Sequence, residues 1–222
     1  MEITQNDREE IEAAVKDAEG KTSGEIVPLL VQRSGEYDSL RPRAVMMGAM
    51  IGALVSLLGV MSQIPSADSF EVLALDINFL TAAIAPVFIG GFVLGLLSTK
   101  SSRLLRMILP PSVIDDALRA RAQRAFLEHE IFNTRDRTGI LIMVSLDEHR
   151  VTVLADAGIN QKVESSTWDE CVELVLAGIK KGHFGQGMAK SIRRCGDIVT
   201  KAGFTVKADD TNELSDSLKV ED

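Results

Sequence analysis

Two long stretches without a charged side chain constrain this sequence more than any other feature. The first runs from Ala44 to Ala67, and the second runs from Ile77 to Thr99. Each is long enough for a helix of about 20 residues, which at 1.5 Å rise per residue crosses about 30 Å of hydrocarbon. We therefore predict a two-helix transmembrane hairpin over residues 41–100, with spans at about 44–63 and 78–98. Burying such a hairpin in a soluble core would need a far larger protein around it.

The charges that flank these stretches predict an orientation. Five cations lie just outside them: Arg41, Arg43, Lys100, Arg103 and Arg106. The loop between the stretches carries no cation but three acidic residues: Asp68, Glu71 and Asp76. Because cytoplasmic loops carry an excess of Lys and Arg, we expect an inner (cytoplasmic) membrane protein with two spans, in contact with lipid, and with both termini in the cytoplasm. Two GxxxG pairs, Gly48/Gly52 and Gly91/Gly95, would permit association into an oligomer.

The remaining segments predict a single α/β domain that the hairpin interrupts. Residues 1–40 hold a helix that begins at a Thr4/Asp7 capping signal, followed by an apolar strand from Gly24. Residues 112–205 hold a helix, two strands at 138–146 and 149–158, and two further amphipathic helices. One helix and one strand cannot close a core, so the two parts must combine into a small mixed sheet sandwiched by helices. Residues 101–111 form an interfacial linker and residues 206–222 a polar, extended tail in this prediction.

The composition excludes some classes of function. A net charge of −8 and a pI near 5.0 argue against a nucleic-acid partner, which requires a basic surface. The two cysteines, Cys171 and Cys195, have no metal-ligand spacing, and we expect buried, reduced thiols at both positions. The sequence contains no phosphate-binding loop and no nucleophilic cysteine signature for phosphoryl transfer.

A series of short motifs resembles the TPM domain, a family named for thylakoid-lumen, photosystem II repair and receptor-modulator proteins. The motifs are Glu25–Val27, Thr138–Gly139, Leu146–Glu148, Gly158, Phe184–Gly187 and a tail motif at Asn212–Asp216. The resemblance covers about residues 1–40 and 115–203, and it is closest to a bacterial branch of membrane proteins with an inserted hairpin. It implies an α/β/α sandwich, in some members with a divalent cation on acidic loop residues. It also implies an acid phosphatase activity, which was assigned to a plant relative.

Acidic residues beside the second and third strands give the candidate site. Asp147, Glu148 and Asp156 supply the oxygen ligands that Ca²⁺ or Mg²⁺ prefers, and we predict them as metal ligands. Glu25 and Asp38 could join them if the first strand lies nearby. The alternative is that Asp147 and Glu148 merely favour a turn while Asp156 caps the following segment. Where many members of the family have Gly-Tyr-Gly, this sequence has Asp156–Gly158, which weakens the transfer of activity.

Two functions follow as alternatives. The first is a membrane-tethered interaction, assembly or modulatory module whose cytosolic domain binds a protein partner. The second is a divalent-metal-dependent phosphatase that hydrolyses phosphomonoesters with Asp147, Glu148 and Asp156 around the ion. No catalytic residue can be assigned, because the three histidines are scattered and no serine or threonine has a partnering base. We therefore favour the first function and do not expect an enzyme.

Overall fold

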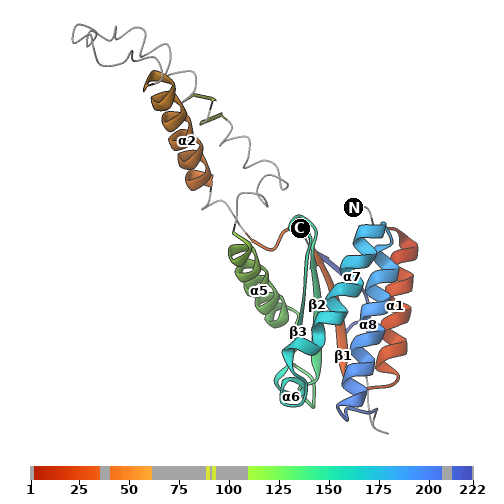
Figure 1. Ribbon diagram of the computed structural model, residues 1–222. Helices are drawn as coiled ribbons and strands as arrows, with labels where there is room; N and C mark the ends of the chain where they lie inside the picture. The colour runs from red at the N-terminus through yellow and green to blue at the C-terminus, as the bar shows by residue number, and fades with distance from the viewer. Residues whose placement is uncertain are drawn as a thin grey trace, which may run out of the picture. The chain divides into compact units, whose positions relative to one another are not determined.

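A computed structural model describes residues 3–35, 41–61, 89–90, 92–93, 110–206 and 212–221 (Figure 1). The chain divides into two compact units. Unit 1 comprises Met1–Gly35 and Ser112–Asp222, and unit 2 comprises Glu36–Pro111. Several predicted features lie outside the described residues: Asp38, the acidic loop, most of the second span, the Gly91/Gly95 pair and nearly all of the interfacial linker.

In the part of the chain that the structure describes, unit 1 is built on a mixed sheet of four strands in the order β3-β2-β1-β4, of which Figure 1 labels β1, β2 and β3. β1 (Glu25–Val31) runs parallel to β2 (Gly139–Ser145), with Glu25 opposite Gly139. β3 (Arg150–Ala155) is antiparallel to β2, and β4 (Lys219–Glu221) is parallel to β1. All side chains of β1 and β2 are buried, as expected for central strands with apolar side chains on both faces.

Helices cover both faces of this sheet. α1 (Gln5–Glu19), α7 (Asp169–Lys181) and α8 (Phe184–Lys201) bury one core cluster with Ile26, Leu30 and their neighbours (Figure 1). α5 (Pro111–Glu128) packs on the opposite face, against Val27, Leu29 and other residues. α6 (Ala157–Asn160) and a 3-10 turn (Ser165–Trp168) connect β3 to α7. The predicted α/β class and mixed sheet are thus confirmed.

A local sequence signal explains where α1 begins. Thr4 accepts a hydrogen bond from Asp7 N–H while the Asp7 carboxylate accepts one from Thr4 N–H, which is the predicted capping box. The 206–222 tail was predicted as a polar, extended segment without a strand assignment, and its residues Lys219–Glu221 form β4. The Glu221 carboxylate contacts Arg121 on α5 and His129 just after α5, and these contacts tie the short strand to the rest of unit 1.

Unit 2 contains α2 (Arg41–Met61), a helix that the sequence predicted as the first membrane span. Among the described residues, no helix combines the length and the apolar character that a membrane crossing requires. The first turn of α2 carries Arg41, Pro42 and Arg43, and the second predicted span is described only at residues 89, 90, 92 and 93. The finding contradicts the prediction of a two-span protein of the inner membrane with an inserted transmembrane hairpin.

Candidate functional site

The three acidic residues that the sequence predicts as metal ligands lie at two separate places. Asp147 and Glu148 follow β2 in the turn to β3, whereas Asp156 follows the far end of β3, opposite Gly139. β3 has six residues, so about 20 Å of strand separates the turn from Asp156. An antiparallel hairpin brings together the residues at its turn, but it places the end of its second strand at the opposite end of the sheet.

Each of these carboxylates already has partners within the fold. Asp147 accepts hydrogen bonds from Gln32 (2.8 Å) and from Arg33 (3.0 and 3.1 Å). Glu148 is buried, where it accepts hydrogen bonds from the Ser34 N–H (3.2 Å) and the Ser145 hydroxyl. These contacts attach the segment after β1 to the segment after β2, and they satisfy the charge that the turn buries.

Asp156 has a comparable structural role at the other end of the sheet. Its carboxylate forms a two-point ion pair with Arg137, at 2.6 and 2.9 Å, and caps α6 through the Ala157 N–H at 2.6 Å. Gly158 follows at a close backbone approach, since a Cβ there would lie 2.6 Å from the Arg137 carbonyl oxygen. Arg137 itself has a positive φ of 56°. The Asp156–Gly158 motif thus packs the start of α6 against the loop before β2.

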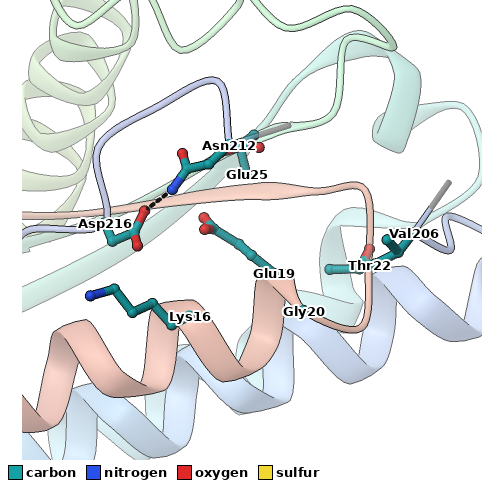
Figure 2. A pocket seen from close by; sticks show the side chains of 8 residues that line it. All are labelled: Lys16, Glu19, Gly20, Thr22, Glu25, Val206, Asn212 and Asp216. Atoms are coloured by element: carbon teal, nitrogen blue, oxygen red, sulfur yellow. Dashed lines mark hydrogen bonds between the residues drawn. The ribbon is translucent and has the colours of Figure 1, made fainter. Parts of the chain in front are cut away.

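A pocket at the open edge of β1 brings together a different set of acidic residues (Figure 2). We call it the edge pocket; its volume is about 250 Å³, and it is lined by Lys16, Glu19, Gly20, Thr22, Glu25, Val206, Asn212 and Asp216. β4 pairs with β1 only at Leu29–Val31, so it does not cover the first half of β1. The end of α1, the first half of β1 and the segment before β4 therefore form the walls.

The Glu19 side chain supplies a hydrogen-bond acceptor at the open edge of β1. Its Oε1 accepts a hydrogen bond from the Ile26 N–H at 2.9 Å, a bond that a neighbouring strand would otherwise make. Pro28 is next on the same side of β1, because the N–H groups of a strand alternate in direction, and proline has no N–H to satisfy. Pro28 thus lies where the edge of β1 is open, which is the position that a proline in a strand favours.

Glu25 anchors the C-terminal segment over the pocket. Its carboxylate accepts hydrogen bonds from the backbone N–H groups of Glu213 and Leu214, each at 3.3 Å. The Asn212 amide donates to Asp216 at 2.5 Å, so the segment is also bonded within itself. In Figure 2, the side chains of Lys16 and Glu19 point from α1 toward Asp216.

The electrostatics of the edge pocket favour a bound proton. Burial raises the pKa of Glu19 to about 8, and the nearby negative charges of Glu25 and Asp216 act in the same direction, against the Ile26 N–H. Burial also raises the pKa of Glu25. Glu19 is therefore largely protonated at neutral pH and can share its proton with Asp216 through a hydrogen bond.

The edge pocket can hold a proton or a cationic group, but its lining offers no nucleophile with a base. Of the described residues that line it, none is a histidine, cysteine or serine, and the Thr22 hydroxyl donates to the Phe204 carbonyl at 2.6 Å. Within the described ranges, no group of three or more His, Cys, Asp or Glu side chains could hold a metal ion. The described lining thus offers carboxylates with raised pKa values beside Lys16.

Of the edge-pocket residues, Glu25 was predicted as a possible site residue, and Asn212 and Asp216 were predicted only as part of a tail motif. One signal could have indicated Glu19: it is the last residue of α1, where the helix dipole disfavours a negative charge. Asn212 and Asp216 could not be placed by periodicity, because they belong to an irregular segment that only the fold brings beside α1.

Comparison with known proteins gives a partial family match. No curated protein matches the chain. Among solved structures, the chain is similar to the NMR structure of the BA42 protein from the psychrophilic bacterium Bizionia argentinensis, with a TM-score of 0.55 and 20% identity over 99% of this chain and 96% of that chain. At this identity the likeness concerns the fold alone. The TPM domain model matches residues 94–198, which include α5, β2, β3, α7 and most of α8 but not α1 or β1. Residues 94–198 thus carry a TPM domain match, and the mixed four-stranded α/β sheet is consistent with a TPM fold.

Proposed function

We propose that this protein is an interaction module in which the exposed apolar surface of α2 docks onto an apolar surface of a partner polypeptide. The exposed apolar side chains of α2 support the proposal. Among the side chains of α2 that the structure describes, eight large apolar ones are exposed: Met46, Met47, Met50, Ile51, Leu54, Val55, Leu57 and Leu58. Met50 is 68% exposed and Leu54 is 56% exposed. A continuous apolar surface of this kind marks an interaction site, since leaving it in water costs about 25 cal/mol per Å².

The ion pairs of the acidic residues in unit 1 favour an interaction module over a metal-dependent phosphatase. Asp147 and Asp156, two of the predicted metal ligands, are neutralised by arginines. A catalytic metal would have to displace those arginines and to bridge residues at opposite ends of β3. Arg33 and Arg137 thereby give Asp147 and Asp156 structural partners within unit 1.

Association of the full chain tests the proposal. We expect the purified wild type to run, by size-exclusion chromatography with light scattering, at a mass above that of one chain, because a second copy or a co-purified polypeptide is bound to α2. Replacing Met50 and Leu54 by Gln should return the protein to the mass of a single chain, because the docking surface becomes polar. Leu127→Gln is the matched control, since Leu127 is 63% exposed but lies on α5 in unit 1.

Two results would contradict the proposal. One is a wild type with the mass of a single chain and no bound polypeptide. The other is equal loss of association in the α2 variant and in Leu127→Gln. If millimolar Ca²⁺ or Mg²⁺ raised the Tm, and if the protein hydrolysed a phosphomonoester in a reaction that Asp147→Ala abolished, the phosphatase would be the better account.

A further inference from the structure

The two cysteines of the chain, distant in sequence, meet inside unit 1. Cys171 lies on α7 and Cys195 on α8, and their Sγ atoms are 3.2 Å apart. Both residues are fully buried, at 0% exposure, in the core cluster between these helices and the sheet. The Cys195 thiol donates a hydrogen bond to the Cys171 sulfur, so the two side chains face each other directly.

Three further contacts hold α7 and α8 in the register that pairs these thiols. At one end of the helix pair, a Cβ on Gly187 would lie 2.8 Å from the Gly178 Cα, so the two backbones approach very closely. Near the cysteines, the Ser191 hydroxyl donates to the Cys171 carbonyl at 2.8 Å. The neighbours of the cysteines, Glu170 and Arg194, form an ion pair at 2.7 Å.

This close approach suits a disulfide. Packed helix axes usually lie 8–10 Å apart, whereas the Cα atoms of a disulfide lie about 4.4–6.8 Å apart. At Gly178 and Gly187 the backbones of α7 and α8 come nearer than usual, and at the cysteines the two Sγ atoms already lie 3.2 Å apart. The sulfur atoms need to move together by only about 1 Å to reach a bond length of about 2.05 Å.

We propose that Cys171 and Cys195 form a redox modification site at which a small peroxide generates an intramolecular disulfide. The Cys171 thiolate attacks one oxygen of hydrogen peroxide, the O–O bond breaks, and the departing hydroxide takes a proton to become water. The resulting sulfenic acid on Cys171 is attacked by the Cys195 sulfur, which loses its proton, and a second water leaves. Two thiols lose two electrons and two protons in total, while one peroxide is reduced to two waters.

The surroundings of the two sulfur atoms distinguish their roles. The hydrogen bond from Cys195 lowers the pKa of Cys171, which favours its thiolate. Burial raises the pKa of Cys195, which disfavours its thiolate. Arg194, which is adjacent to Cys195 in sequence, lowers the pKa of both thiols, whereas Glu170 opposes the thiolate of Cys171. Peroxide is small enough to reach the pair through local opening of the helices.

Alkylation and mass spectrometry of the full chain test the proposal. The reduced protein is treated with hydrogen peroxide, quenched with catalase, denatured and alkylated with N-ethylmaleimide. We expect two adducts on the reduced protein and none on the oxidised protein, whose Cys171 and Cys195 peptides should be linked within one chain. The Tm should rise on oxidation and return to its original value with dithiothreitol, because the disulfide restricts the unfolded chain.

Single variants check the order of the steps. Cys195→Ser should stop at a sulfenic acid on Cys171 that dimedone traps, and Cys171→Ser should react more slowly at Cys195. If a serine disturbs the core, Cys195→Ala and Cys171→Ala serve the same purpose. Two alkylatable thiols in the peroxide-treated wild type, disulfides only between different chains, or equal peroxide reactivity of both single variants would each overturn the proposal.

Discussion

Glu19 ends α1 at a position where both the helix dipole and its neighbours disfavour a negative charge. Its pKa rises from 4.5 to about 8 in the folded protein. Between these values the folded state holds a proton that the unfolded state has lost, so the free energy of unfolding falls as the pH rises. Because Glu19 is only half-buried, we expect this loss to be on the order of 2 kcal/mol rather than the full value of the shift.

Glu19→Gln should remove most of this pH dependence. The glutamine keeps an oxygen for the Ile26 N–H but cannot ionise, so the variant should be more stable than the wild type at about pH 9 and similar at about pH 5. Urea unfolding across this range measures the difference. Glu9→Gln, on the exposed side of α1, is the matched control and should follow the wild type. Parallel curves for the wild type and Glu19→Gln would show that the pocket does not hold a proton.

At the scale of elements, the packing of α7 on α8 depends on Gly187. Alanine at this position gains about 1 kcal/mol of helix propensity, but its Cβ would lie 2.8 Å from the Gly178 Cα and 3.0 Å from the Leu174 carbonyl oxygen. Overpacking against backbone atoms costs about 1–3 kcal/mol, because backbone cannot rotate away. Gly187→Ala should therefore lower the free energy of unfolding, by about 1 kcal/mol on balance.

A urea unfolding series measures this effect. Lys190→Ala, at an exposed position of the same helix, changes helix propensity little and should leave the midpoint nearly unchanged. A Gly187→Ala variant as stable as the wild type would mean that the two helices can separate at little cost. The register of α7 and α8 would then not explain why Cys171 and Cys195 lie together.

The elements that the sequence predicted are those with strong local signals. The Thr4/Asp7 capping box marks the start of α1, and the uninterrupted apolar residues of β1 and β2 indicate central strands. β4 was missed because three residues are too few to show a period, and its position depends on pairing with Leu29–Val31. The edge pocket and the cysteine pair were missed because both depend on contacts between segments that are far apart in the chain.

At the scale of the whole molecule, the core clusters and the proposed docking surface belong to different units. Unit 1 contains both core clusters. It consists of Met1–Gly35 and Ser112–Asp222, which precede and follow unit 2 in the sequence. The exposed apolar surface belongs to α2 in unit 2. This division predicts that substitutions on α2 change association while the stability of unit 1 stays the same. In the TPM-matched part of unit 1, by contrast, substitutions of core residues would change stability.

Site-specific photo-cross-linking of the full chain in cells tests whether α2 contacts a partner polypeptide. A photoreactive residue at position 54 lies on the exposed surface of α2, and one at position 127 lies at an equally exposed apolar position of unit 1. The proposed interaction module predicts a discrete cross-linked polypeptide, either a second copy or a different protein, from position 54 and not from position 127. Absence of any cross-linked polypeptide from position 54, or the same products from both positions, would contradict it.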